Sequence, residues 1–187
     1  MIGNAENSEN ELIRRCQEKD GPAFDALIRR YRKPLFTFFL RFYGEKAMAE
    51  DLFQDTLVKV WRALPAFRNT GSFSSWLFSI AHNVARDALR RQKARAHISY
   101  RSELPDAPDV HSPADDLVAN EIEAMIRHAV QQLPPKQRQV FLLRQHGDLA
   151  FKEIAKVTGE PLNTVLSHMR YAVAKLKKAL REKGAIV

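Results

Sequence analysis

The sequence contains only one cysteine, Cys16, and only seven glycines among its 187 residues. A single cysteine forms no internal disulfide and supplies no cysteine-based zinc site. No glycine-rich phosphate loop and no G-x-S-x-G elbow occurs. The six histidines are scattered, without an H-E-x-x-H pattern. The sequence therefore predicts no catalytic constellation, no metal site and no cofactor, and we do not expect an enzyme.

Long apolar runs are missing as well. The longest strongly apolar cluster is LFTFFL at residues 35–40, and the first residues, MIGNAENSENE, are acidic and polar. A membrane-spanning helix needs about 20 apolar residues, and a signal peptide needs a basic start followed by an apolar run. We therefore expect no membrane insertion, no signal peptide and a cytoplasmic protein.

Positive charge, by contrast, is abundant, with 30 Lys and Arg against 22 Asp and Glu and a sequence pI near 9.8. The charge is uneven, because residues 1–98 and 121–187 each carry a net +6 and residues 99–120 carry −4. Such a balance favours a polyanionic partner, although many basic soluble proteins share it. Charge alone leaves nucleic-acid binding open.

The spacing of apolar residues is helical on both sides of the acidic stretch, with no sustained alternation of period two. The acidic stretch, SELPDAPDVHSPADD, carries three prolines, which remove backbone donors and disfavour helix in the residue before them. We therefore predict an all-α protein of two small helical domains, residues 1–98 and 112–187, joined by a flexible acidic linker at residues 99–111.

Capping residues predict where the helices of the N-terminal half begin and end. We expect Ser8, Asp20 and Ser72 to cap helix starts, and we expect Gly44 and Pro65 to end helices. The helix after Asp20 is expected to bend at its internal proline, Pro34. The helix that ends at Pro65 is expected to bury one face, made of Phe53, Leu57, Val60, Trp61 and Leu64.

The C-terminal half shows similar punctuation. Ser112 followed by Pro113 resembles a capped helix start, Pro134 and Pro135 force a break, and Gly147 is expected to close the next helix. Two further helices follow in the segment around residues 151–182. Together these helices predict a compact bundle.

The segment KEIAKVTGEPLNTV has the pattern of a helix-turn-helix. Small Ala155 permits close helix approach, Gly159 allows the turn, and Val165 locks the second helix against the first. An ordinary helical hairpin would show the same residues. The second helix, however, exposes polar side chains and runs into the basic KLKKALREK, which favours contacts with bases or phosphates in a major groove.

Four separated motifs together resemble the extracytoplasmic-function (ECF) group of bacterial sigma factors. They are AEDLFQDTLVKVWRALPAF, FSSWLFSIAHNVARDALRRQKAR, LPPKQRQVFLLR and the EIA and TV.S signatures of the helix-turn-helix. The resemblance covers nearly the whole chain in the same order. It implies a factor that binds core RNA polymerase, opens the minus-ten region of promoter DNA and reads the minus-35 element. It also implies an anti-sigma protein as partner and a stress or envelope-response regulon.

Carboxylates gather on one face of the third predicted helix. Glu50, Asp51, Gln54 and Asp55 lie opposite its apolar stripe, and without the resemblance they would be read as a solvated face. In the family this D-L-x-Q-[ED] helix docks on the clamp helices of the polymerase, where acids and an amide pair with basic side chains. The resemblance therefore implies that Asp51, Gln54 and Asp55 contact core polymerase.

Aromatic and basic residues follow this helix closely. Phe73 and Trp76 are as consistent with core packing as with a nucleic-acid role. Separating DNA strands, however, calls for a surface that captures unstacked bases beside phosphate-neutralising arginines. The resemblance places the minus-ten element here, with Phe67 and Asn83 lining a pocket for a flipped base. The expected minus-ten residues are Phe67, Trp76, Asn83, Arg86 and Arg90.

The resemblance places the minus-35 contacts on the second helix of the helix-turn-helix, at Asn163, Thr164, Leu166, Ser167, His168, Arg170 and Tyr171. The chain departs from the family here, because many members carry arginine or lysine where Leu166, His168 and Val173 stand. Fewer fixed charges imply fewer phosphate or guanine contacts, and Leu166 could touch a thymine methyl instead. Ala150 also replaces a common helix cap, so we expect that helix either to rely on Asp148 or to begin less firmly.

Two other classes of protein would explain parts of the sequence. A one-component transcription regulator accounts for the helix-turn-helix but gives no purpose to the polymerase-type helix or the aromatic segment. A helical enzyme acting on nucleic acid would need metal ligands or a general base, which we do not find. For the acidic linker, the resemblance implies passage through a polymerase channel, and the simpler reading is a solvated tether.

Overall fold

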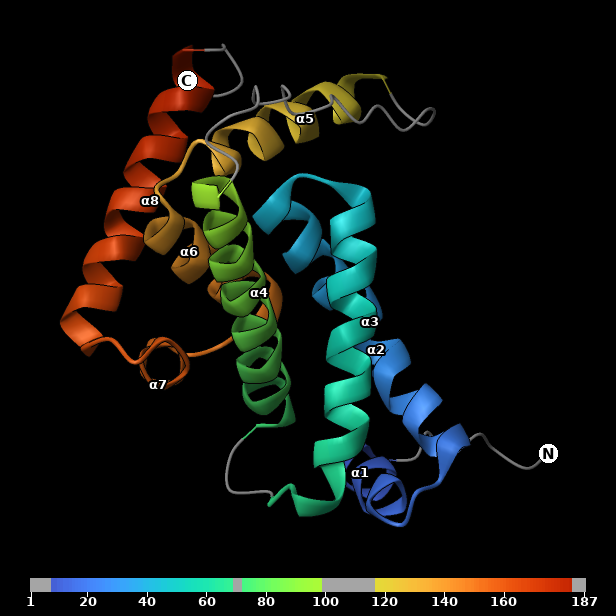
Figure 1. Ribbon diagram of the computed structural model, residues 1–187. Helices are drawn as coiled ribbons and strands as arrows, with labels where there is room; N and C mark the ends of the chain where they lie inside the picture. The colour runs from blue at the N-terminus through green and yellow to red at the C-terminus, as the bar shows by residue number, and fades with distance from the viewer. Residues whose placement is uncertain (1–7, 69–71, 99–116, 183–187) are drawn as a thin grey trace.

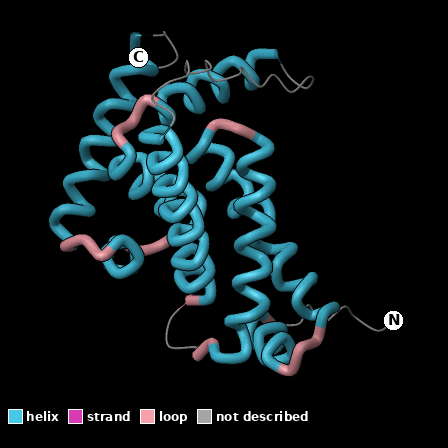
Figure 2. The backbone as a smooth tube through the Cα atoms, viewed as in Figure 1, coloured by secondary structure: helices cyan, strands magenta, loops and turns pink. Residues whose placement is uncertain are grey.

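The computed structural model describes residues 8–68, 72–98 and 117–182, and within these ranges the chain is helical and contains no strand (Figure 1, Figure 2). The helices in chain order are α1 (Glu9–Gln17), α2 (Gly21–Tyr43), α3 (Lys46–Ala63), the short 3-10 helix η1 (Leu64–Ala66), α4 (Phe73–Ile98), α5 (Leu117–Gln131), α6 (Pro135–Gly147), α7 (Phe151–Thr158) and α8 (Leu162–Glu182). The prediction of an all-α protein is confirmed. None of the described helices combines the length and apolarity needed to span a bilayer.

The predicted helix ends of the N-terminal half are confirmed. The side chains of Ser8, Asp20 and Ser72 each accept a hydrogen bond from the backbone N–H three residues later, at 3.3, 3.0 and 3.1 Å. Each bond satisfies a donor that has no partner inside the helix. Gly44 ends α2 in the left-handed conformation, with φ of 81°. Helix α2 runs through Pro34 without ending.

The buried face of α3 differs from the prediction by about one residue. Its buried side chains are Ala49, Leu52, Thr56 and Val60, whereas Phe53, Leu57 and Trp61 are only partly buried. The helix packs between α2 and α4, so its apolar residues serve two neighbours and the most buried line lies between them. Thr56 tolerates this burial because its hydroxyl donates to the Leu52 carbonyl at 2.7 Å.

Helix α6 begins after the predicted break at Pro134, but its end differs in detail from the expectation. Gly147 is the last helical residue, and the left-handed position belongs to Asp148, with φ of 50°. Gly147 is needed for a different reason. A Cβ placed there would lie 3.1 Å from Cγ of Phe78 in α4, so the glycine allows the two halves of the chain to approach closely.

Helix α7 does not begin as expected. Asp148 pairs with Arg144 at 3.5 Å and gives α7 no cap. Instead, the Glu153 carboxylate turns back and accepts from the Ala150 N–H at 2.8 Å. The turn between α7 and α8 follows the prediction, because Gly159 adopts a left-handed conformation with φ of 71°. The two helices of the predicted helix-turn-helix are therefore present.

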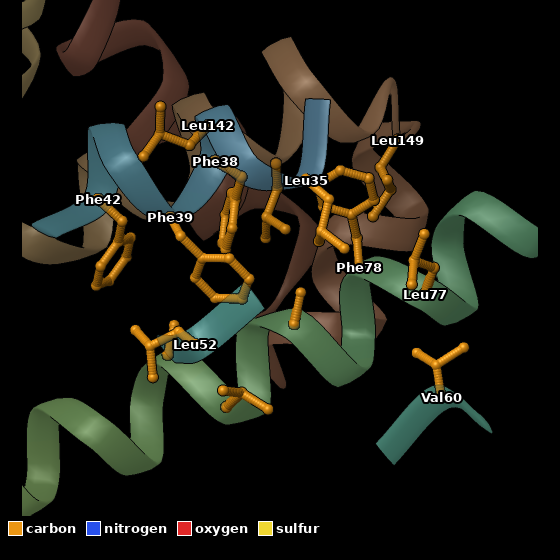
Figure 3. Packing of buried hydrophobic residues seen from close by; sticks show 14 of the residues in the cluster. Leu35, Phe38, Phe39, Phe42, Leu52, Val60, Leu77, Phe78, Leu142 and Leu149 are labelled. Carbon is orange, nitrogen blue, oxygen red and sulfur yellow. The ribbon is translucent and has the colours of Figure 1, made fainter. Parts of the chain in front are cut away.

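A continuous apolar core joins the N-terminal and C-terminal halves. Leu142 and Leu149 lie close to Phe38 and Phe78, and all four side chains are fully or almost fully buried (Figure 3). Helix α6 packs on α2, and α7 packs on α4 (Figure 1). The two helical units predicted from the sequence thus lie against one another, and buried apolar residues of both belong to one core.

Polar contacts also cross this boundary. Arg138 in α6 donates to the Phe42 carbonyl at the end of α2 at 2.8 Å and to the Leu133 carbonyl at 3.1 Å. Arg41 in α2 pairs with Glu123 in α5 at 2.9 Å. Because Arg138 satisfies carbonyls on both sides, it fixes α6 against the end of α2.

Two expectations fall outside the described residues. They are the acidic linker at residues 99–111 and the capped helix start at Ser112 and Pro113. The domain boundaries and the path of the linker therefore remain predictions.

Candidate nucleic-acid interface

Helix α8 exposes the side chains that the sequence predicts to meet DNA. Val165 is fully buried and holds the helix against α7, while Asn163 and Arg170 are exposed on the outer face. Leu166 and Tyr171 are 41% and 50% exposed, so apolar groups also reach solvent on this face. The Arg170 guanidinium lies 5.2 Å from the centre of the Tyr171 ring. The outer face thus combines an amide, a guanidinium and apolar groups.

Three predicted minus-35 residues lie nearer the edge of this face. Thr164, Ser167 and His168 are only partly exposed. The buried Nε2 atom of His168 lies 3.4 Å from the Glu160 carboxylate, which also pairs with Lys136 of α6 at 2.8 Å. This ring nitrogen therefore lies near the turn that carries Glu160, although it makes no hydrogen bond there. Beyond these residues, α8 carries exposed basic side chains at Lys175, Lys177, Lys178 and Arg181.

The aromatic residues between α3 and α4 pack together. Phe67 is only 7% exposed, and its ring centre lies 4.7 Å from that of Trp76 and 5.7 Å from that of Phe73. Gln17 of α1 donates to the Phe67 carbonyl at 2.7 Å and fixes the backbone there. Phe73 is almost fully buried, as the core reading of the sequence expected, whereas Trp76 is partly exposed. Trp76 therefore offers the accessible ring of this group.

The remaining minus-ten candidates follow Trp76 along one exposed face of α4. Asn83, Arg86 and Arg90 are exposed, and their spacing keeps them on the side of the helix that bears Trp76. Asn83 lies two turns beyond Trp76, a rise of about 10 Å. The structure therefore aligns Trp76, Asn83, Arg86 and Arg90 on a surface with positive charge at one end, and it buries Phe67 beside the other end.

A cavity of about 300 Å³ separates this aromatic group from α7. Phe67, Ser72, Ser75, Trp76 and Ser79 line one side of it. Glu153, Lys156 and Val157 of α7 line the other side. No local sequence pattern indicates this arrangement, because the two walls lie some 80 residues apart in the chain.

The acidic face of α3 is exposed as expected. Glu50, Asp51, Gln54 and Asp55 all reach solvent. Gln54 lines a groove of about 1040 Å³ between α2 and α3, whereas Asp51 and Asp55 line a smaller cleft of about 300 Å³ between α3 and α4. The three predicted polymerase contacts therefore lie on one exposed arc of the helix but border two different depressions.

Val58 is a residue of this face that the sequence prediction missed. It is 49% exposed and follows Asp51 and Asp55 by seven and three residues, which places it near them on α3. A single exposed valine is common on protein surfaces, and here it adds apolar area next to the carboxylates of α3. The helical spacing of apolar residues did not indicate it, because Val58 lies outside the apolar stripe of α3.

Two histidines, the buried His82 and the half-buried His146, lie close to the boundary between the halves. His82 in α4 is 3% exposed and contacts Gln139 of α6, and burial together with the charge of Arg86 lowers its pKa to about 4. Burial and the charge of Arg41 likewise lower the pKa of His146 to about 4. Within the described residues, no group of three or more His, Cys, Asp or Glu is placed to hold a metal ion.

Comparison with known proteins assigns the two halves to two regions of one family. Residues 27–95 match the family Sigma-70 region 2, and residues 123–176 match the family Sigma-70, region 4. The first match contains the acidic helix and the aromatic segment up to the basic end of α4. The second contains the helix-turn-helix.

Similar proteins extend the match to almost the whole chain. The RNA polymerase sigma-H factor of Pseudomonas aeruginosa is 31% identical over 184 residues, which covers 94% of this chain and 95% of that protein. The ECF RNA polymerase sigma-E factor of Escherichia coli is 26% identical and covers 87% of this chain and 88% of its own length.

Solved structures share the fold. The sigma factor RpoE of Bartonella quintana, solved with the anti-sigma factor NepR, superposes with a TM-score of 0.72 at 22% identity, covering 84% of this chain and 96% of that one. CnrH, solved with the cytosolic domain of CnrY, gives a TM-score of 0.68 at 24% identity, covering 93% and 97%. At these identities the likeness concerns the fold.

The order of region 2 and region 4 in one helical chain defines a transcription initiation factor. The chain belongs to the sigma-70 family, in its extracytoplasmic-function group. It is a sigma factor rather than a one-component regulator, because a regulator would explain region 4 alone.

Proposed function

We propose that this sigma factor binds core RNA polymerase through α3, captures minus-ten DNA on α4 and reads the minus-35 element with α8. The observation that carries the proposal is the pairing, in one chain, of an exposed acidic face in region 2 with an exposed recognition helix in region 4. The chain carries no reaction of its own in this proposal and acts in the cytoplasm, where polymerase is found.

The polymerase contact consists of Asp51, Gln54 and Asp55, to which we add Val58. Carboxylates on a rigid helix pair well with arginines and lysines of a partner, and they steer its approach over some distance. Val58 supplies apolar area that is already exposed in the free chain. Its truncation would weaken binding without opening a cavity in the core.

The minus-ten surface consists of Phe67, Trp76, Asn83, Arg86 and Arg90. Stacking of a base on an aromatic ring contributes about 1–3 kcal/mol, and arginines along the same helix can neutralise phosphates. Trp76 is the ring that can stack without rearrangement, because it is partly exposed. Phe67 is buried and packs against the ring of Trp76, so it would reach a base only if its packing changed.

The minus-35 contacts come from α8, with Asn163 and Arg170 as the exposed polar readers and Leu166 and Tyr171 beside them. Arginine recognises guanine and asparagine recognises adenine, while Leu166 can contact a thymine methyl. Thr164, Ser167 and His168 lie at the edge and suit phosphate contacts. The basic end of α8 adds contacts that do not depend on sequence.

Two weak DNA contacts joined by residues 99–111 give an avidity that depends on the spacing between promoter elements. An anti-sigma protein is expected to hold the factor inactive. This expectation is supported by the fold shared with the sigma factor RpoE of Bartonella quintana, which was solved with the anti-sigma factor NepR.

Multi-round transcription with purified core polymerase on genomic DNA, followed by mapping of start sites, tests the proposal. We expect new starts that share two conserved elements at a constant spacing. Transcripts that did not depend on the added factor would refute the proposal.

Variants assign the surfaces. Asp51→Ala/Gln54→Ala/Asp55→Ala should lose affinity for core polymerase, measured by fluorescence anisotropy. The control, Glu11→Ala/Glu18→Ala, removes the same number of exposed carboxylates from the α1 region and should bind normally. Equal affinities of the two variants would remove α3 from the proposal.

Promoter binding by the holoenzyme tests the DNA surfaces separately. Asn83→Ala and Phe67→Leu should weaken binding to the non-template strand of the minus-ten element. Phe67→Leu keeps most of the buried volume but removes the flat ring. Arg170→Ala should weaken binding to minus-35 duplex alone. If Asn83→Ala bound the strand as tightly as the parent chain, Asn83 of α4 would not belong to the capturing surface. The same result for Phe67→Leu would remove Phe67 from it.

A further inference from the structure

Glu160 places a carboxylate beside α8, although the proposed ligand of that helix is a polyanion. The residue follows Gly159 in the turn of the helix-turn-helix, and its side chain is only 16% exposed. The Thr158 hydroxyl accepts from the Glu160 N–H at 3.4 Å and donates to the Ile154 carbonyl at 2.8 Å, which holds the turn against α7. The fold therefore fixes where this carboxylate lies.

The two oxygens of this carboxylate face two different basic groups. Oε1 pairs with the Lys136 ammonium of α6 at 2.8 Å, and Oε2 lies 3.4 Å from Nε2 of His168 on α8. Helix α6 packs on α8, so the three side chains lie where α6, the turn and α8 meet. Lys136 therefore holds one oxygen of Glu160, and the other oxygen lies next to the histidine.

The ring of His168 lacks a hydrogen-bond partner on its buried side. Its Nε2 atom is shielded from solvent and makes no hydrogen bond, although the Glu160 carboxylate is close. Buried polar atoms without a partner are rare and need an explanation. A carboxylate only accepts hydrogen bonds, so in the neutral ring the proton belongs on Nε2, and Nδ1 is then an acceptor. An acceptor gives a DNA phosphate nothing to bind.

Protonation of the ring changes both of its sides. The imidazolium has a hydrogen on each nitrogen, so Nε2–H can donate to the Glu160 carboxylate while Nδ1–H donates to an external anion. Hydrogen bonds between ionised groups are shorter and stronger than neutral ones, and the buried Nε2 gains the partner that it lacks. The three side chains together change from neutral to singly positive. Only the protonated ring therefore attracts a phosphate.

Other elements packed against α8 add no second carboxylate at this ring. Helices α5, α6 and α7 all contact α8. Among the described residues, Glu160 is the one carboxylate that pairs with His168, and Lys136 binds the other oxygen of that carboxylate. On α8 itself, the Arg170 guanidinium lies 5.2 Å from the centre of the Tyr171 ring. The charge of His168 therefore responds to Glu160 on one side and to a ligand of the exposed face on the other.

We infer that His168 is a proton-linked phosphate contact of α8 and that Glu160 is the residue that positions it. Binding of duplex DNA takes up a proton from solvent at His168, which closes the hydrogen bond to Glu160 and adds a positive charge at the interface. Lys136 offsets the repulsion between the Glu160 carboxylate and the phosphates. The inference rests on the proposed function of α8 as the duplex-reading helix. It adds a dependence of that function on proton concentration.

Binding of the full chain to a tetramethylrhodamine-labelled 20-base-pair duplex of random sequence, measured by anisotropy at pH 8 and pH 6, tests the inference. Histidine changes its charge within this range. A random duplex is sufficient because phosphate contacts do not depend on sequence. His168→Gln removes the titrating ring, so its comparison with the parent cancels the effect of the other five histidines.

Because the phosphate favours the protonated ring, affinity should rise as the pH falls. The attraction between unit charges about 4 Å apart in water corresponds to about a fivefold change in affinity. The ratio of affinities at pH 6 and pH 8 should therefore be about fivefold larger in the parent than in His168→Gln. The added phosphate contact should also steepen the slope of log affinity against log salt by about 0.9 at pH 6, in the parent only.

Glu160→Gln separates positioning of His168 from support of the fold. Glutamine keeps the shape of the side chain, but it pairs less strongly with an imidazolium and does not repel DNA. This variant should bind the duplex at pH 8 at least as tightly as the parent, and its affinity ratio should fall to within about twofold of that of His168→Gln. Glu182→Gln is the matched control, because it removes a carboxylate from the far end of α8, and it should keep the parent's ratio.

Ring ¹⁵N chemical shifts of the full chain report the charge of His168 directly. At pH 7, addition of the duplex should move both ring nitrogens of His168 to the values of an imidazolium in the parent and not in Glu160→Gln. A ring that stays neutral in the parent complex would overturn the inference. A Glu160→Gln chain with the parent's affinity ratio would remove Glu160 as the positioning residue.

Arg170→Ala distinguishes failure of the inference from failure of the proposed function. If the parent and His168→Gln have equal affinity ratios while Arg170→Ala weakens duplex binding, α8 remains the duplex-reading helix and only the inference fails. If Arg170→Ala and His168→Gln both bind as the parent does at each pH, the proposed function of α8 fails as well.

Discussion

His82 should make the stability of the chain depend on pH between about 6.5 and 4. The residue lies on α4, is 3% exposed and contacts Gln139 of α6, and its pKa is lowered from the ordinary 6.5 to about 4. Arg86 opposes protonation, and the charge of Asp87 only partly offsets it. The neutral ring is therefore the form that packs between the halves.

The sign and size of the effect follow from proton linkage. Above pH 6.5 the ring is neutral in both the folded and the unfolded chain, so its packing contributes fully. As the pH falls from 6.5 towards 4, only the unfolded chain takes up the proton, and the folded state loses stability. Between pH 7.5 and 5.5 the loss is about 1.3 kcal/mol for His82. His146 adds a smaller loss of the same sign, because solvent screens this half-buried ring.

Urea denaturation of the parent chain and of His82→Gln at pH 7.5 and 5.5 measures how much His82 contributes to this loss of unfolding free energy. Glutamine keeps a neutral polar side chain near Gln139 but does not titrate. The drop in unfolding free energy on acidification should be smaller by about 1.3 kcal/mol in His82→Gln than in the parent. Carboxylates are largely ionised at pH 5.5 and contribute similarly to both chains. Equal drops in both chains would refute the assignment of the titration to His82.

Three further predictions address other parts of the molecule. Leu142→Ala should lower the unfolding free energy by about 2–5 kcal/mol in urea denaturation, because the leucine is fully buried near Phe38. Arg138→Met should lower it by about 1–3 kcal/mol, since carbonyls at the ends of α2 and α5 lose their donor, and a smaller loss than in Lys136→Met would contradict this role. Val58→Asp should weaken binding to core polymerase about tenfold while leaving the urea midpoint unchanged, because the side chain is 49% exposed.

Much of the fold could be predicted from local signals. Each predicted cap lies within the segment it ends, so Ser8, Asp20 and Gly44 act without help from the rest of the chain. The buried face of α3 could not be fixed in this way. Positions 52 and 53 are both apolar, as Leu52 and Phe53. Only the placement of α2 and α4 decides which of the two side chains is buried deeper.

Local sequence patterns likewise predict some features of the candidate sites and miss others. The exposure of Asp51, Asp55 and Arg170 follows from helical spacing, so the sequence could predict it. The burial of Phe67 depends on its packing against Phe73 and Trp76 of α4 and on the hydrogen bond from Gln17 of α1, which no periodic pattern records. His82 was an intermediate case. It falls four residues after Phe78 on the inward face of α4, and that phase could have indicated its burial.

The boundary between the N-terminal and C-terminal halves is apolar, and this limits which partners can separate the two halves. Phe38, Phe78 and Leu149 would meet water if the halves separated, and exposing such groups is unfavourable by about 25 cal/mol for each Å². A ligand shifts this equilibrium only by its preference for the open state. A single strand that stacks on Trp76 gains a few kcal/mol in binding free energy. It does not cover Phe38 or Phe78, which separation of the halves would expose. A large protein partner can both bind α3 and replace the lost apolar contacts. Core polymerase, rather than promoter DNA, is therefore expected to separate the halves first.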